Sequence, residues 1–385
     1  MSLAEQTAAT PAMLGLFSPG ATVQAMLDVE AALAQAGAAT GLISAQSALA
    51  IGNACQGADI DLELLADDAR HSGTLVIPLV QWLKSRVPGH ESAVHVGGTS
   101  QDIIDTAMVL QLRAGVALLQ ADLSRMADAA ATLAQAHTAT PLAGRTLLQP
   151  ALPITLGLKA AYWLAAITDS RRAIAHASAT AFFLQCGGAA GTLDVPGENY
   201  PAFVQAFAGA LALPVGLPWH TARAPLVRLA SSIAAAVGAA GKIGTDIALM
   251  MQPEIGEAAE PAAPGRGGSS AMAHKRNPTL SIAARAAAIR MPGYIATLLA
   301  AQDQAHERAA GAWQAEAVTW TALILCASGG LAAIAQALPG LEINPQRMAE
   351  NLAQLAPAQP SAAIPHLIET ALADHQAFQG TRAHD

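Results

Sequence analysis

The stretch GGSSAMAHKRNP, residues 267–278, passes from glycine and serine to two cations, an amide and a proline. Glycine leaves the backbone free to move, and the serines add hydroxyl groups beside unpaired backbone N–H donors. Pro278 stands where the first turn of a helix can begin, because the N–H group that proline lacks is not needed there. Such a segment can close over an anion, with Lys275 and backbone N–H groups holding the charge and a serine hydroxyl delivered to the carbon skeleton.

Apolar residues with helical spacing lie on both sides of this stretch. We expect long helices at residues 101–137, 153–185, 224–251, 278–304 and 313–338. Shorter helices are expected at 22–37, 44–52, 61–70, 75–87 and 200–211. No convincing alternation of apolar and polar residues occurs, so we expect almost no strand. Five long helices joined by loops describe a bundle, and the predicted fold class is all-α.

The change in helix length divides the chain into three parts. We expect a small helical domain at residues 1–98 and a central long-helix bundle at 99–340, which carries the loop at 265–278. A short C-terminal segment at 341–385 follows. Residues 376–385 are mostly polar, so we expect them to be disordered.

The composition limits the classes of partner. Hydrophobic residues make up 53% of the 385 residues and charged residues 12%, which suggests that apolar surface is also buried between subunits. The net charge of −8 argues against nucleic acid as the main partner. Lys242, Asp246, Arg285 and Arg290 interrupt the most apolar runs, so these runs are expected in a protein core and not in a membrane.

The three cysteines and the N-terminus bear on location. Cys55, Cys186 and Cys326 are scattered and lack the spacing of a metal site, which favours buried thiols in a reducing cytoplasm. The first residues lack a basic region followed by an apolar core, so no signal peptide is predicted. We expect a cytoplasmic enzyme without a metal or cofactor.

The string at 267–278 resembles the signature loop of the fumarase/aspartase superfamily, G-S-S-x-M-P-x-K-x-N-P. It departs from that pattern at Ala273, where the family has proline. A Gly-Ser-Ser alone would be read as a solvated linker before a basic helix start, but the full string matches many fixed positions. The resemblance implies that Ser269 is the catalytic base on a flexible loop and that Lys275 and Asn277 bind a substrate carboxylate. It also implies a homotetramer whose bundles share one core and whose active sites are composite.

A second block, HVGGTSQD at residues 95–102, is a glycine turn that opens a helix. Its hydroxyls and amide lie where the helix dipole favours anions. An ordinary N-cap is an equally good interpretation of these residues taken alone. Because the family places substrate-binding groups here, the resemblance points to Thr99, Ser100 and Gln101.

A third block, PLAGRTLLQPA at residues 141–151, resembles the corresponding segment of adenylosuccinate and argininosuccinate lyases. Those enzymes have a Thr-His-Leu-Gln core, whose histidine is a general acid backed by a glutamate after the signature lysine. This chain has Leu147 and Ile282 at the two positions, so the proton-transferring pair is absent. The residues of the block expected to bind substrate are Arg145, Thr146 and Gln149.

That double absence, together with GRT at 144–146, PWHT at 218–221 and HERAAG at 306–311, resembles the bacterial 3-carboxy-cis,cis-muconate cycloisomerase branch. The resemblance runs from Phe17 to Leu352. It implies an intramolecular lyase that interconverts 3-carboxy-cis,cis-muconate and 4-carboxymuconolactone in protocatechuate (β-ketoadipate) degradation.

The chemistry implied is the addition of a substrate carboxylate across a conjugated double bond, with charge building up on a neighbouring aci-carboxylate. The site must position and stabilise a tricarboxylate. The expected cations are Lys275, Arg276, Arg145, Arg308 and His95, although each arginine could equally form a structural ion pair. Our hypothesis is that Ser269 transfers the proton while Lys275 holds the developing charge.

The sequence is less compatible with three other interpretations. An adenylosuccinate lyase-like enzyme would release fumarate, but Leu147 and Ile282 count against it. A non-catalytic structural relative would have no use for an anion-binding loop with Ser269, Lys275 and Asn277 intact. A coiled-coil scaffold would need sustained charged e and g positions, which the helices lack.

Overall fold

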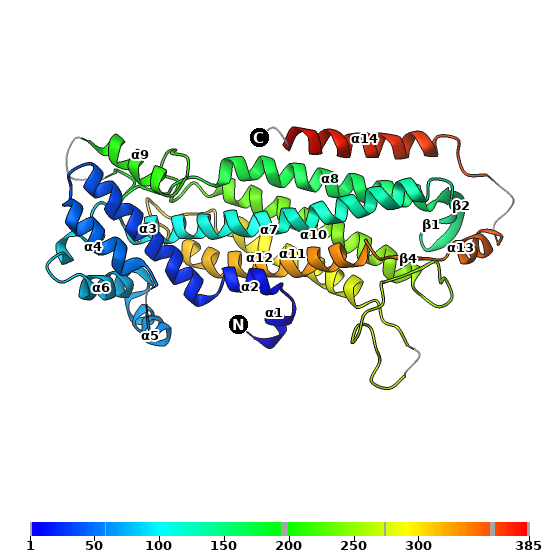
Figure 1. Cartoon of the computed structure of the whole chain (residues 1–385), viewed down its shortest axis with the longest axis horizontal. Coiled ribbons are helices and arrows are strands. Elements are labelled where there is room, and N and C mark those ends of the chain that lie inside the picture. The colour runs from blue at the N-terminus through cyan, green and yellow to red at the C-terminus, as the bar shows by residue number, and fades with distance from the viewer. Residues whose placement is uncertain (1, 58, 194–198, 273–274, 355–358, 383–385) are drawn as a thin grey trace.

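The computed structural model describes residues 2–57, 59–193, 199–272, 275–354 and 359–382. Five long helices of the described chain lie side by side (Figure 1). They are α7 (Ser100–Ala136), α8 (Leu156–Ala181), α10 (Ala224–Met250), α11 (Thr279–Ala300) and α12 (Ala312–Ala337). The all-α prediction and the expected five-helix bundle are confirmed.

Small residues let the long helices approach one another closely. A side-chain carbon on Gly241 would come within 2.5 Å of the Ala288 Cβ atom, so α10 and α11 are in direct contact. A carbon on Gly330 would come within 2.6 Å of Ala287 Cβ, which brings α12 against the same helix. The core between the helices is built mainly of Ala, Leu, Ile and Val, and its packing needs few aromatic side chains.

Shorter helices form a second packed region at one end of the bundle (Figure 1). Helices α1 (Leu3–Thr7) and α2 (Pro11–Leu16) precede this region, and Met13 of α2 packs in the core of the long helices. The second region consists of α3 (Pro19–Ala39), α4 (Ala45–Cys55), α5 (Leu62–Ser72), α6 (Val76–Arg86), the 3-10 turn η1 (Glu91–Ala93) and α9 (Tyr200–Ala210). Ser44 accepts a hydrogen bond from the Ser47 N–H group at 3.0 Å, which confirms the predicted N-cap of α4. These helices surround the N-terminus of α7 and so position the residues that precede it.

A β-hairpin occupies the segment between the first two long helices, where almost no strand was expected. Strand β1 (Pro141–Thr146) pairs antiparallel with β2 (Gln149–Thr155), and a second short pair joins β3 (Ala258–Ala259) to β4 (Glu342–Ile343). Leu147 and Leu148 form the hairpin tip with φ angles of 49° and 67°. Two-residue tips with left-handed backbone usually carry Asn and Gly, so two leucines give no sequence signal for a hairpin.

The C-terminal part is more ordered than expected. Helix α13 (Pro345–Leu352) is followed by α14 (Ile364–Arg382), which lies along α8 (Figure 1). The prediction of disorder is therefore wrong for residues 376–382, while 383–385 lie outside the described residues. Ile364 and Ile368 are buried, and Asp374 pairs with Arg172 of α8 at 2.9 Å. Contacts with α8 therefore stabilise a helix that the polar sequence of this segment did not indicate.

Helices α10 and α12 are long and apolar enough to cross a membrane. Within the described chain, 61% and 72% of their most apolar windows are buried in the bundle. Core helices of this kind pass the same test of length and composition, so the two helices are weak evidence for a membrane span.

Candidate active site

The residues expected at the site lie at two ends of the bundle (Figure 1). The α7 N-terminal cluster contains His95, Thr99, Ser100, Gln101 and Arg308. The signature-loop end contains Arg145, Thr146, Gln149, Ser269, Lys275, Arg276 and Asn277. Helix α7 separates the two, and its 37 residues span about 55 Å at ~1.5 Å per residue. One chain therefore does not bring the two sets together.

Arg308 binds the start of α7. Thr99 is the N-cap residue, and its hydroxyl oxygen accepts a hydrogen bond from Arg308 Nη1 at 2.9 Å. Ser100 is the first residue of the helix and is half-buried. The partners of Arg308 are this hydroxyl and the carbonyl oxygens of Gly188 (3.2 Å) and Ala189 (3.0 Å), which are neutral groups. The guanidinium charge and the helix N-terminus together favour an anion here.

Asp102 holds the loop 187–191 against this cluster. Its buried carboxylate accepts hydrogen bonds from the backbone N–H groups of Gly187 (2.9 Å), Gly188 (3.0 Å) and Thr99 (3.2 Å), and from the Gln185 amide (3.1 Å). Burial outweighs these bonds and raises the pKa of Asp102 to about 6. The N–H groups of the loop thus bind Asp102, and the carbonyl groups of the loop bind Arg308.

His95 precedes α7 in a left-handed backbone conformation, with φ at 66°. Its Nδ1 atom lies 2.6 Å from Glu30 Oε1 on α3, and Glu30 is buried. Burial by itself lowers the pKa of His95, but the hydrogen bond and charge of Glu30, with a smaller contribution from Asp102, outweigh it and raise the pKa. His95 is therefore more readily protonated than an ordinary histidine.

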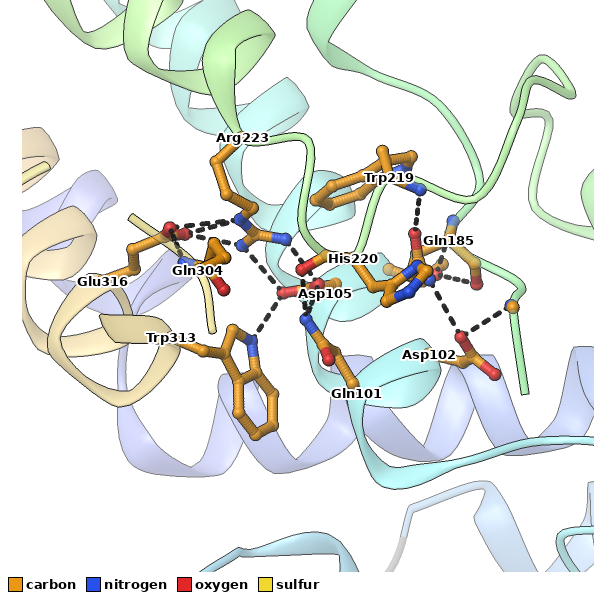
Figure 2. A network of polar contacts seen from close by, with 12 residues as sticks. Gln101, Asp102, Asp105, Gln185, Trp219, His220, Arg223, Gln304, Trp313 and Glu316 are labelled. Atoms are coloured by element: carbon orange, nitrogen blue, oxygen red, sulfur yellow. Dashed lines mark hydrogen bonds and ion pairs between the residues drawn. The ribbon is translucent and has the colours of Figure 1, made fainter. Parts of the chain in front are cut away.

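Gln101 belongs to a buried polar network (Figure 2). Its amide nitrogen donates to Asp105 Oδ2 at 3.2 Å and to the His220 carbonyl oxygen at 2.9 Å. Both donors of this fully buried side chain are therefore taken by protein groups, and its Oε1 atom has no partner among the described residues. This geometry makes Gln101 a support for the loop at His220, whereas the sequence pointed to substrate contact.

A buried arginine joins three helices in the same network (Figure 2). Arg223 donates to Asp105 of α7 at 2.6 and 3.1 Å and to Glu316 of α12 at 2.6 and 2.9 Å. Trp313 Nε1 also donates to Asp105, at 3.0 Å. Burial raises the pKa of Glu316, although the charge of Arg223 opposes this. No sequence motif marks this group, and its one signal is the presence of charged residues on otherwise apolar helices.

At the other end, Arg145 is held in an ion pair. Its two terminal nitrogens lie 3.0 and 3.1 Å from the carboxylate oxygens of Glu257, which also accepts from Asn351 at 2.8 Å. Thr146 and Gln149 are exposed beside the hairpin tip. The ion pair with Glu257 thus holds Arg145 in place, whereas Leu147 at the hairpin tip is exposed.

The signature loop is folded onto the start of α11. Asn277 donates from its backbone to the Gly267 carbonyl at 2.7 Å and from its side chain to the Gly268 carbonyl at 3.2 Å. Gly267 has a φ of 71°, and a side-chain carbon there would come within 2.7 Å of the Asn277 carbonyl oxygen, so the closure requires glycine. The Ser269 hydroxyl oxygen accepts from the N–H groups of Ala271 (3.3 Å) and Met272 (3.1 Å).

The cations of this loop differ in their contacts. Arg276 pairs with Glu342 at 2.6 and 2.8 Å. Lys275 is exposed, and the described residues provide no ion pair for it. Lys275, Asn277 and Met272 line a groove of about 1080 Å³ between the loop and β4. Ala273, where the chain departs from the family pattern, and His274 lie outside the described residues.

The comparisons with known proteins place the chain in a family. Residues 4–293 match the lyase family, and the chain belongs to it, within the fumarase/aspartase superfamily. The 3-carboxy-cis,cis-muconate cycloisomerase of Bradyrhizobium diazoefficiens is 46% identical, over 86% of this chain and 74% of the relative. The nitrosuccinate lyase of Streptomyces davaonensis is 41% identical, over 87% of this chain and 73% of the relative.

A solved structure is similar over almost its whole length. The crystal structure of 3-carboxy-cis,cis-muconate lactonizing enzyme from Pseudomonas putida has a TM-score of 0.93 and 36% sequence identity. The match covers 98% of this chain and 99% of that one.

Proposed function

We propose that this protein is a 3-carboxy-cis,cis-muconate cycloisomerase, an intramolecular lyase that interconverts 3-carboxy-cis,cis-muconate and 4-carboxymuconolactone. The proposal places it in protocatechuate degradation by the β-ketoadipate pathway. It is supported by relatives with this activity, including the one from Bradyrhizobium diazoefficiens, and by the fold of the Pseudomonas putida lactonizing enzyme.

The observation that carries the proposal is the chemistry of Leu147 and Ile282. Leu147 stands at the hairpin tip with 96% of its surface exposed, and Ile282 is exposed near the start of α11. Neither side chain can give or take a proton. Ring closure by a carboxylate of the substrate has no leaving amine to protonate, so it fits a site that lacks this pair.

The residue roles follow from charge and position. His95, Arg308 and the N-terminus of α7 would bind substrate carboxylates, with Thr99 and Ser100 adding hydroxyl groups. Lys275 would hold the charge that develops during ring closure, Asn277 would bind a carboxylate, and Ser269 would transfer the proton. Arg145 and Arg276 are already paired with Glu257 and Glu342, so we assign them to holding the hairpin and loop in place.

We further propose a homotetramer with composite active sites. One face of α11 exposes small and apolar residues at alternating spacings of four and three, the pattern of a helix–helix seam. We call it the α11 stripe; it consists of Ile282, Ala286, Ile289, Gly293, Ala296 and Ala300. A second copy packed on this stripe would cover it, and neighbouring copies would bring an α7 N-terminal cluster to a signature loop.

A cytoplasmic location is also proposed. The three cysteines are free and buried, and burial raises the pKa of Cys55 and Cys186 to about 12. Thiols of this kind are unreactive and suit a reducing compartment.

The test is a comparison of three substrates with the purified, assembled protein. Loss of ultraviolet absorbance from 3-carboxy-cis,cis-muconate should be rapid, because the conjugated diene disappears on ring closure. Adenylosuccinate should give no fumarate, and nitrosuccinate should give no nitrite. Turnover of either of these two with an unchanged muconate spectrum would overturn the proposal in favour of a C–N lyase.

A further inference from the structure

The contact between His95 and Glu30 joins two elements that are 65 residues apart in the sequence. Nδ1 of His95 and Oε1 of Glu30 are 2.6 Å apart, which is short for a hydrogen bond between these groups. The His95 side chain keeps 20% of its surface exposed, whereas Glu30 keeps 1%. The carboxylate therefore takes one ring nitrogen and leaves the other end of the ring accessible.

The backbone around His95 is shaped to hold this ring. A left-handed conformation is unfavourable for a residue with a side chain, and such strain is often found at functional positions. Gly98 lies under the ring: a side-chain carbon at Gly98 would be 3.7 Å from His95 Cε1 and 2.9 Å from Leu33 Cδ2. The ring consequently lies over the turn that leads into α7, next to the residue bound by Arg308.

Burying the Glu30 carboxylate has a desolvation free energy that packing alone does not offset. Its second oxygen, Oε2, is buried without a partner in the part of the chain that the structure describes. A buried carboxylate with one hydrogen bond is stabilised mainly by a positive partner, and His95 is the group in contact with it. This arrangement favours the imidazolium form, in which both ring nitrogens carry protons.

We propose that Glu30 is a positioning residue that holds His95 as a fixed cation, so that His95 Nε2–H binds one carboxylate of the substrate. That this substrate is a tricarboxylate rests on the proposed function. Together with Arg308 and the N-terminus of α7, His95 then gives the cluster a second cation whose charge depends on a neighbour in another helix.

The charged groups acting on His95 are Glu30 on α3, Asp102 on α7 and Lys84 on α6. Glu30 and Asp102 favour protonation, and Lys84 opposes it. Because the pKa of His95 is raised, its charge persists to a higher pH than that of an ordinary histidine and is lost as the pH rises further. Binding of a polyanion should weaken on the alkaline side for that reason.

The test measures binding without turnover. Propane-1,2,3-tricarboxylate, a non-reactive triacid, is titrated calorimetrically into the assembled protein between pH 6 and 9, and a histidine ring NMR titration follows the protonation of His95. Glu30→Gln keeps the shape but removes the charge. It should move the alkaline loss of binding and the His95 titration to lower pH, and weaken binding near pH 7.5 about tenfold. Glu30→Asp should retain more of the wild-type behaviour.

Two further variants complete the design. His95→Asn should abolish the alkaline loss of binding with Glu30 in place. Asp128→Asn is the matched control, since Asp128 faces His375 at 3.5 Å in another part of the fold and should leave the profile unchanged. An unaltered His95 titration in Glu30→Gln, or an unaltered profile in His95→Asn, would overturn the proposal. The binding test uses no muconate. Its outcome therefore does not depend on whether the protein turns over muconate in the cycloisomerase assay.

Discussion

Asp102 shows how a single buried carboxylate can shape the pH dependence of the fold. Its pKa of about 6 exceeds the ordinary value of 3.8. A carboxyl group with a raised pKa contributes stability that is fully present below pH ~4 and lost as the pH rises through about 6. Between these limits, Asp102 makes the free energy of unfolding fall with increasing pH.

Asp102→Asn should remove this slope. The free energy of unfolding of the variant, relative to the wild type, should rise by about 1–3 kcal/mol between pH 4.5 and 7, since one pKa unit corresponds to ~1.4 kcal/mol. Denaturant unfolding at several pH values measures it. Asp169→Asn, at a side chain that is 83% exposed, is the control. Parallel curves for wild type and Asp102→Asn would contradict the pKa assignment.

Ser269 carries the second prediction at this scale. Ser269→Ala removes the hydroxyl assigned to proton transfer, so kcat for muconate ring closure should fall about 100-fold or more. Ser270→Ala is the matched control: the neighbouring serine is exposed and should keep kcat within about threefold. Circular dichroism should show unchanged helicity in both. A Ser269→Ala enzyme with near-normal kcat would remove this residue from the mechanism.

At the scale of elements, Arg223 links α7, α10 and α12 through Asp105 and Glu316. Arg223→Gln leaves two buried carboxylates without a cation, which should destabilise the fold by about 3–5 kcal/mol. The loss should be smaller at pH 5 than at pH 8, because the raised pKa of Glu316 allows its neutralisation by a proton.

The comparison for Arg223 is Arg172, whose pair with Asp374 at 2.9 Å lies on the surface. Arg172→Gln should cost less than about 1 kcal/mol. Thermal and denaturant unfolding at the two pH values distinguish the cases. Equal losses in the two variants, or no effect of pH on Arg223→Gln, would argue against a buried charge network.

The elements differ in how far sequence predicts them. Periodic apolar residues placed the long helices within a few residues of their observed ends, and Ser44 marked the start of α4, because both signals are local. The hairpin tip at Leu147 and Leu148 and helix α14 depend on packing that no local pattern records. The same holds for the site: Thr99 and Lys275 lie in motifs, whereas the Glu30–His95 and Asp105–Arg223 contacts join residues 65 and 118 positions apart.

At the scale of the whole molecule, the separation of the two sets of residues makes mixing experiments informative. Arg308→Ala should inactivate the α7 N-terminal cluster, and Ser269→Ala the signature loop. If each site takes its two halves from different copies, a refolded equimolar mixture should have about a quarter of its sites intact. Assays of the parents and the mixture measure this.

The control for mixing disrupts assembly. Ile289→Glu places a charge on the α11 stripe at a position that is 78% exposed in one chain. Light scattering should show smaller particles, and mixtures that carry this change should regain no activity. Leu64→Glu, an exposed leucine on α5, should leave assembly intact. A mixture as inactive as both parents, with normal assembly, would contradict composite sites.

Helix α7 acts as a rigid spacer, and this restricts how the chain can change in length. Inserting one residue within it would rotate everything beyond by ~100° and advance it by ~1.5 Å, which would break the packing against α8 and α12. A matched insertion in every partner helix would be needed to restore register. Related chains should therefore gain and lose residues in connecting segments, whereas the length of α7 should be nearly constant.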